Sequence, residues 1–246
     1  MNEFEREVAE RIAANGADRP LQEAAHGFMT VSIAARYSYN FSWLGRPIIQ
    51  YPQDIVAMQE LIWSLQPELI VETGIAHGGS LIFSASMLEL NAACGGPSDA
   101  RVVGVDIDIR PHNRAAIEAH PMMGRITMIE GSSVAPEVVA TIRAHTAGKK
   151  SVLVCLDSNH THEHVLAELE AYAPMTTVGS YCVVFDTIVE DLPKELSGDR
   201  PWGPGDNPKT AARRFLAAHP EFEIDRRFDA RLLIGVAPQG YLRRVR

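Results

Sequence analysis

The chain has 246 residues, of which 46% are hydrophobic and 22% charged, which suits one soluble domain with a substantial core and leaves little room for a second. A formal net charge of −8 disfavours binding to nucleic acid through its phosphates. The sequence has no apolar run as long as a membrane span and does not open with a signal-peptide pattern, so we expect a cytoplasmic protein without membrane insertion.

The three cysteines do not form a pattern that indicates disulfides or a metal site. Cys94, Cys155 and Cys182 are odd in number and lack the spacing of metal ligands. Cys155 and Cys182 stand inside apolar, strand-like runs, which is typical of reduced core residues.

The first fifty residues are predicted to be an N-terminal helical extension. Residues 2–15 have the pattern of an amphipathic helix, and residues 23–36 that of a second one. Residues 37–51 are aromatic and irregular, and could either wall a pocket or pack into the core. We therefore divide the chain into residues 1–50, a possible lid or oligomer contact, and residues 51–246, the main domain.

A glycine-rich stretch at residues 69–80, LIVETGIAHGGS, organises the main domain. A short apolar run ends in Glu72, and Ser80 opens an apolar-periodic segment that continues to residue 90. Between them stand three glycines: Gly74, Gly78 and Gly79. This is a strand, a tight loop and a helix; such glycines let the backbone approach a ligand, and the helix start offers free N–H groups. A plain tight turn is the alternative.

Strands and helices then alternate to the end of the chain. Further strands are predicted at 101–107, 125–129, 151–156 and 181–185, and helices at 52–65, 112–119, 136–145, 163–172 and 208–218. The last part is predicted as two strands, 222–226 and 231–236, joined by a turn. The alternation predicts an α/β fold with a doubly wound, mostly parallel, seven-stranded Rossmann-like sheet and an antiparallel strand from the C-terminal end.

Acidic residues follow five of these strands. They are Glu72, Asp106, Glu130, Asp157 and Asp186. The carboxyl ends of parallel strands meet at one edge, so these acids should gather there and repel one another unless hydroxyls, a cation or a cationic ligand compensate. Asp106, with Asp108 beyond it, is placed to hold a ribose diol.

The stretch DSNHTHEH at residues 157–164 adds catalytic side chains to this edge. His160 stands three residues after Asp157, at the predicted start of a helix, and Asp186 ends the adjacent strand. Two carboxylates there suit Mg²⁺, and a neutral histidine beside them could act as a general base. His160 could instead have only a hydrogen-bonding role, and the spacing of the histidines does not indicate zinc. We expect Glu190 and Asp191 to be solvated loop acids.

Several segments together resemble the cephalosporin hydroxylase and rhamnosyl O-methyltransferase family. They are VETGIAHGGS (71–80), GVDID (104–108), LDSNHTHEHVLAEL (156–169) and VVFDT (183–187). The segments YNFSWLGRPIIQYPQD (39–54) and DRPWGPGDNPKTA (199–211) resemble those that flank the family's motifs. The resemblance covers nearly the whole chain from about Tyr37.

The resemblance implies a class I methyltransferase fold that binds S-adenosylmethionine, with relatives among metal-dependent sugar O-methyltransferases. It assigns Asp157 and Asp186 to Mg²⁺, and His160 to the role of base, with Asp157 beside it in the catalytic centre. Phe185 stands where the family has the first acid of a pair, so Asn159, Glu190 or water would have to substitute. Nothing in the sequence indicates an oxygenase centre.

The expected contacts of S-adenosylmethionine follow its three parts. The amino-acid end would lie near the glycine loop, the ribose on the acid after the second strand, and the adenine beyond the third strand. The residues expected to contact it are Glu72, Gly74, His77, Gly78, Ser80, Asp106, Asp108, Ser132, Ser133 and Asp157.

We therefore expect an S-adenosylmethionine-dependent, Mg²⁺-assisted O-methyltransferase that acts on a hydroxyl of a sugar or glycosylated small molecule and forms a homo-oligomer. An accessory protein that binds S-adenosylmethionine without turnover is one alternative. An NAD-dependent oxidoreductase is another, although Ala76 stands where the dinucleotide pattern G-x-G-x-x-G requires glycine.

Overall fold

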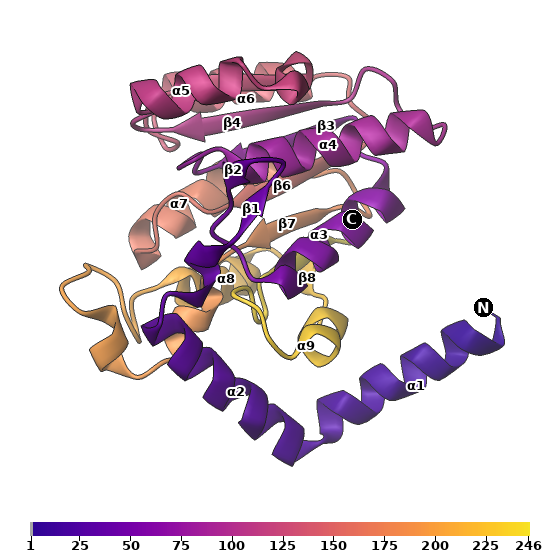
Figure 1. The fold of residues 1–246 in the computed structure, drawn as a ribbon, viewed down its shortest axis with the longest axis vertical. Coiled ribbons are helices and arrows are strands. Elements are labelled where there is room, and N and C mark those ends of the chain that lie inside the picture. The colour runs from indigo at the N-terminus through magenta and orange to yellow at the C-terminus, as the bar shows by residue number, and fades with distance from the viewer. Residues whose placement is uncertain (1) are drawn as a thin grey trace.

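A seven-stranded sheet forms the centre of the computed structural model, which describes residues 2–246, and its strand order is β5-β4-β3-β6-β7-β9-β8 (Figure 1). The strands are β3 (Leu69–Thr73), β4 (Arg101–Asp106), β5 (Ile126–Glu130), β6 (Val152–Leu156), β7 (Tyr181–Val184), β8 (Phe222–Ile224) and β9 (Tyr241–Arg244). Strands β3 to β7 pair in parallel, whereas β9 is antiparallel to both β7 and β8. The predicted sheet, with its antiparallel C-terminal strand, is confirmed.

Helices cover both faces of the sheet because alternate side chains of each strand point to opposite sides. Ile70 and Leu153 belong to one hydrophobic cluster, and Val71 and Val154 to the other. The first cluster is covered by α3 (Pro52–Leu65), α4 (Gly79–Ala93) and α5 (Pro111–Glu118), and the second by α6 (Pro136–Thr146), α7 (His162–Tyr172) and α8 (Pro208–Ala218). No helix within residues 2–246 is both long and apolar enough to cross a membrane.

Cys155 and Cys182 are buried free thiols, as the sequence predicts. Cys155 belongs to the first cluster and Cys182 to the second.

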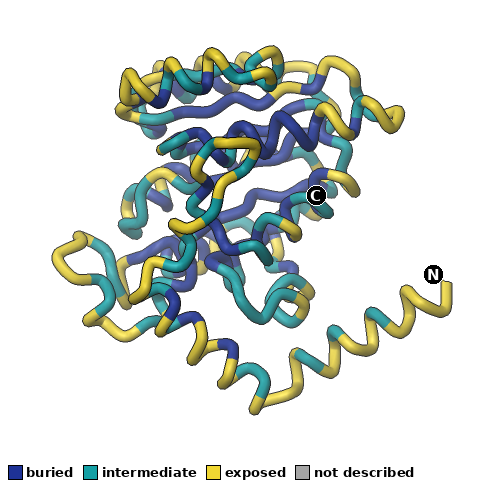
Figure 2. The backbone as a smooth tube through the Cα atoms, viewed as in Figure 1, coloured by how far each residue is buried: buried dark blue, intermediate teal, exposed yellow. Residues whose placement is uncertain are grey.

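Two helices and a small hairpin precede α3. Helix α1 (Glu3–Ala17) buries none of its residues and projects from the body (Figures 1 and 2). Helix α2 (Arg19–Ala34) begins four residues earlier than predicted, because the Asp18 side chain accepts a hydrogen bond from the Leu21 N–H and Pro20 suits a first helical turn. After a 3₁₀ turn (Tyr37–Asn40), β1 (Ser42–Trp43) and β2 (Arg46–Pro47) pair antiparallel.

The predicted strand at 231–236 is wrong. Residues 227–232 form the short helix α9 (Arg227–Leu232), and the strand beside β7 is β9, ten residues further along the chain than predicted. An apolar run such as RLLIGV does not distinguish a strand from buried irregular backbone. The buried Asp54 carboxylate accepts a hydrogen bond from the Val236 N–H, which fixes this run outside the sheet.

Candidate active site

The site lies where the strand order reverses, at the carboxyl ends of β3 and β6. Strand β3 pairs in parallel with β4 on one side and with β6 on the other, so the chain leaves the sheet in opposite directions from this point. In open α/β sheets, ligands bind in the crevice that such a reversal creates. The glycine loop follows β3 and Asp157 follows β6, so the topology itself brings these two segments together.

Glycine is required in the loop because the loop passes against the end of β6. Gly74 has a φ of +91°, and a Cβ at this position would lie 2.2 Å from the carbonyl oxygen of Asp157. Gly78 also has a positive φ, of +84°, and directly precedes α4. Only glycine at position 74 therefore lets the loop pass this close to the end of β6.

Neighbouring side chains fix the backbone of this loop. The Asp106 carboxylate accepts hydrogen bonds from the N–H groups of Ile75 and Ala76, at 2.8 and 3.0 Å. Arg46, from the hairpin, donates to the carbonyl oxygen of His77 at 2.6 Å. Asn113, on α5, donates to the carbonyl oxygen of Ala76 at 3.0 Å. The sequence did not reveal the roles of Arg46 and Asn113, because both come from other elements and belong to no local motif.

Glu72 is a buried acid directly before the loop. Glu72 is only 4% exposed, and the Ser84 hydroxyl donates a hydrogen bond to its Oε2 at 3.4 Å. Burial raises the pKa of Glu72 to about 7, against the opposing effect of hydrogen bonds from Ser80 and Ser84. Its Oε1 has no hydrogen-bond partner within residues 2–246, so this oxygen could accept a hydrogen bond from a ligand.

Three further residues meet at the ends of β6 and β7. Asp157, His160 and Asp186 each offer a ligand atom within 4.8 Å of the other two. The His160 Nε2 lies 3.1 Å from Oδ2 of Asp186. Gln50, before α3, donates to Oδ2 of Asp157 at 3.4 Å. The prediction that His160 begins a helix is wrong. His160 lies in the turn before α7, whose N-cap is Thr161.

The electrostatics of this triad favour a cation. Burial raises the pKa of Asp157 well above its ordinary range, and the nearby charge of Asp186 raises it further. A divalent cation between the two carboxylates would oppose both effects. Carboxylate oxygens are also the ligands that Mg²⁺ prefers, so the donor set fits that ion.

Trp202 lies against His160 in the fold, although it belongs to a loop far from it in sequence. Its ring meets that of His160 edge to face, with centroids 4.9 Å apart. Hydrogen bonds hold the Trp202 loop: Glu190 accepts from the Gly205 N–H at 2.7 Å and from the Asn207 side chain. The aromatic ring therefore limits the access of water to one side of the imidazole.

Comparison with known proteins identifies the family. A family model described as "Rhamnosyl O-methyltransferase/CmcI" matches residues 35–245. The chain belongs to this family. A rhamnosyl O-methyltransferase of Mycobacterium leprae is 32% identical over 155 residues, which are 62% of this chain and 62% of that protein. One from Mycobacterium bovis is 27% identical over 194 residues, which are 77% of this chain and 72% of that protein. The predicted enzyme class, O-methyltransferase, is confirmed at the level of the family.

Solved structures confirm the methyltransferase fold. The structure described as "cmcI-D160 Mg-SAM" has a TM-score of 0.57 at 19% identity and covers 85% of this chain and 78% of its own. The structure described as "CmcI-N160 apo-structure" has a TM-score of 0.61 at 21% identity, and the match covers 85% of this chain and 77% of that one. An O-methyltransferase from Bacillus cereus, in complex with S-adenosylhomocysteine, has a TM-score of 0.52 at 17% identity, covering 81% of each chain.

Phe185 stands where the resemblance implies the first acid of a pair, and it is a core residue. Its ring is buried in the first hydrophobic cluster, 6% exposed. Asn159 and Glu190, the expected substitutes, have other partners: Asn159 accepts hydrogen bonds from Thr161, and Glu190 holds the Trp202 loop. Asp186 alone remains, at a strained φ of +53°.

Three residues singled out in the sequence, Asp191, Asp108 and Ser133, contact other side chains of the protein. Asp191 is not simply solvated but pairs with Lys209, which is 2% exposed. Asp108 is exposed and lies 3.9 Å from Arg110. The Ser133 hydroxyl lies 3.1 Å from Nε2 of His164, inside a buried polar network. Ser132, beside it, is half-buried.

Proposed function

We propose that this chain transfers the methyl group of S-adenosylmethionine to a hydroxyl of a sugar or glycosylated small molecule, assisted by Mg²⁺. The observation that carries the proposal is the proximity of the triad Asp157, His160 and Asp186 to the glycine loop. This arrangement would place a base and a cation site beside the glycine loop, where the cofactor would bind. The family's rhamnosyl O-methyltransferases support a sugar acceptor.

The glycine loop and its neighbours would bind S-adenosylmethionine. The unpartnered Oε1 of Glu72 suits the cofactor's ammonium group, beside Gly74. Asp106 and Asp108 would hold the ribose, since a carboxylate that already accepts backbone hydrogen bonds still has lone pairs for hydroxyls. Ser132 and Ser133 would border the adenine. The remaining expected contacts are His77, Gly78, Ser80 and Asp157.

His160 would remove the proton from the acceptor hydroxyl. A neutral imidazole has one N–H and one lone pair, so an Nε2–H donated to Asp186 leaves Nδ1 free to accept that proton. Asp186 then orients the ring and stabilises the charge that the ring gains. Bound to Asp157 and Asp186, Mg²⁺ would act as a Lewis acid and lower the pKa of the hydroxyl.

Residues 2–50 would form an extension on the acceptor side, and the chain would associate with copies of itself. Helix α1 offers a surface for this contact, because Phe4 is 67% exposed and shares its apolar side with the half-buried Val8 and Ile12. Light scattering of the full chain and of Phe4→Glu would test the association. A monomer at micromolar concentration would contradict it.

Calorimetric titration with S-adenosylmethionine and with NAD, each with and without Mg²⁺, tests the proposed function first. We expect S-adenosylmethionine alone to bind, followed by Mg²⁺-stimulated methyl transfer in a screen of glycosides. Binding of S-adenosylmethionine without turnover on any glycoside, with or without Mg²⁺, would favour the accessory protein. Binding of NAD instead would contradict methyl transfer.

A further inference from the structure

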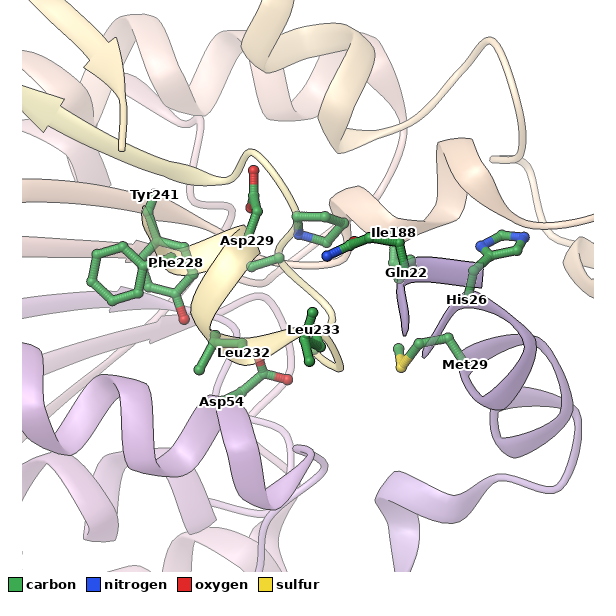
Figure 3. Close-up of a pocket in the computed structure, with 13 residues that line it drawn as sticks. Gln22, His26, Met29, Asp54, Ile188, Phe228, Asp229, Leu232, Leu233 and Tyr241 are labelled. Carbon is green, nitrogen blue, oxygen red and sulfur yellow. The ribbon is translucent and has the colours of Figure 1, made fainter. Parts of the chain in front are cut away.

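A cavity of about 150 Å³ lies between α2, the start of α3, α9 and the segment before β9 (Figure 3). Gln22, His26 and Met29 of α2 form one side of it, opposite α9. Cavities of about this volume hold a benzene molecule in other proteins. Space for one six-membered ring is therefore present.

The floor of this cavity contains a buried carboxylate with an unused oxygen. Asp54 is 0% exposed, and its Oδ2 accepts a hydrogen bond from the Val236 N–H at 2.9 Å. Its Oδ1 has no partner within residues 2–246. A Cβ on Gly235 would lie 2.6 Å from this oxygen, so the glycine leaves it room. A buried carboxylate oxygen without a donor is costly, and a ligand that supplies a donor would remove that cost.

The rest of the lining favours a ring with a donor group. Phe228 and Tyr241 are stacked at 3.9 Å, and Leu232 adds aliphatic surface. The Tyr241 hydroxyl is also buried without a partner in the described part of the chain. Asp229 supplies a second carboxylate, and none of the 13 lining residues is Lys or Arg. The cavity therefore suits a hydroxyl or ammonium group and disfavours an anion.

The cavity and the triad are close in the fold, since the charge of Asp186 contributes to the raised pKa of Asp54. Ile188 lines the cavity and stands only two residues after Asp186, a separation of at most about 7 Å along the chain. Gln50, which contacts Asp157, is likewise four residues before Asp54, at most about 14 Å away. A glycoside bound at the triad through one ring could place a neighbouring ring in the cavity.

We infer that this cavity, the Asp54 subsite, binds a six-membered ring of the acceptor through a hydrogen bond that a hydroxyl or ammonium group donates to Asp54. The identification of this ring as part of the methyl acceptor rests on the proposed function, whereas the binding of a ring with a donor group rests on the cavity alone. The wall formed by α9 is preformed: Arg231 pairs with Glu60 of α3, and the Asp229 carboxylate accepts from the Gln239 N–H at 2.8 Å.

Three soluble probes with the same ring test this chemistry. Cyclohexanol and cyclohexylamine donate a hydrogen bond, whereas cyclohexanone only accepts one. Binding is measured by ligand-observed NMR titration at pH 8.5, above the value of about 7 to which burial raises the pKa of Asp54. We expect cyclohexanol or cyclohexylamine to bind at least about tenfold more tightly than cyclohexanone. The better of the two identifies the donor as hydroxyl or ammonium.

Asp54→Asn should reverse this preference. The asparagine oxygen would keep the hydrogen bond from Val236, because only the oxygen accepts, and the amide nitrogen would replace the unpartnered oxygen. The variant should therefore bind cyclohexanone more tightly than cyclohexanol. Asp99→Asn, an exposed acid outside the cavity, is the charge-matched control and should bind as wild type does. Leu232→Phe, which fills the cavity without changing Asp54, should weaken all three probes.

Equal binding of the three rings, or an unchanged preference in Asp54→Asn with a native circular dichroism spectrum, would overturn the Asp54 subsite. So would the absence of binding of any ring to a wild-type protein that binds S-adenosylmethionine, and the proposed function would then stand. If the rings bind as expected but S-adenosylmethionine does not, the cavity chemistry stands and the proposed function fails.

Discussion

The Nε2 of His160 lies 3.1 Å from Oδ2 of Asp186, although 26 positions of sequence separate the two residues. Parallel pairing of β6 with β7 brings them together, because each residue follows the carboxyl end of one of these strands. The register, with Leu156 opposite Val184, places the turn after β6 beside the turn after β7. The proximity of His160 and Asp186 at this edge is thus a direct consequence of sheet topology.

Removal of the imidazole should stop methyl transfer without preventing cofactor binding. His160→Ala is expected to lower kcat by about 10²- to 10⁴-fold, the usual contribution of a positioned general base. The affinity for S-adenosylmethionine, measured by calorimetry, should change little, because the glycine loop is fixed by other residues. His145→Ala, an exposed histidine on α6, serves as control. Normal turnover in His160→Ala would refute the assignment of the base.

Trp202 should act as a positioning residue for this base. Its edge-to-face contact with His160 holds the ring, and such contacts contribute about 0.5–1.5 kcal/mol. Trp202→Ala should lower kcat by about three- to tenfold, whereas Trp202→Phe should restore most of it because an aromatic edge remains. The pH profile of kcat should shift in the alanine variant, since water gains access to the imidazole. An identical profile and kcat in all three proteins would show that the contact is incidental.

Glycine at position 74 should be indispensable for two separable reasons. Gly74 and Gly95 have nearly the same φ, +91° and +93°, but only at Gly74 would a Cβ meet backbone, 2.2 Å from the Asp157 carbonyl oxygen. Gly95→Ala should cost about 1–2 kcal/mol of unfolding free energy, the price of a left-handed conformation. Gly74→Ala should cost clearly more and weaken S-adenosylmethionine binding. Urea denaturation checks the first effect and calorimetry the second; equal costs at both positions would contradict the close approach.

The elements of this fold that carry local signals were predictable from sequence. Helices α3 and α8 were predicted at their observed bounds, because a proline opens each one and apolar periodicity continues from it. Asp157 and Asp186 were predicted to meet, because each follows a short, apolar strand.

The parts that depend on tertiary packing were not predictable. Strand β9, with the sequence YLRR, has no clear alternation, and it is a strand because β7 leaves an edge to be paired. Arg46 comes from the small hairpin, and Gln50 and Trp202 come from loops; all three reach the site only in the folded chain. The Asp54 carboxylate likewise joins the cavity through the fold, since neither its neighbours in sequence nor its spacing indicates a ligand.

Burial of Glu72 should make the protein less stable as the pH rises through the weakly acidic range. The folded-state pKa is about 7, above the ordinary value of 4.5, so the folded state holds a proton that the unfolded state releases between these values. Because the folded state binds more protons there, the free energy of unfolding falls with rising pH over this interval. Asp54, with a pKa also raised to about 7 by burial, acts in the same direction.

Glu72→Gln removes this charge while keeping an acceptor for Ser84. Its urea-derived free energy of unfolding should depend less on pH between 4.5 and 7 than that of the wild type, and at pH 8 it should exceed the wild-type value by roughly 1–3 kcal/mol. Glu163→Gln, the matched change of an exposed glutamate at the start of α7, should leave the pH dependence as it is. A Glu72→Gln profile parallel to that of the wild type would mean that Glu72 is charged in the folded protein. The unpartnered oxygen would then be compensated by a group other than a proton.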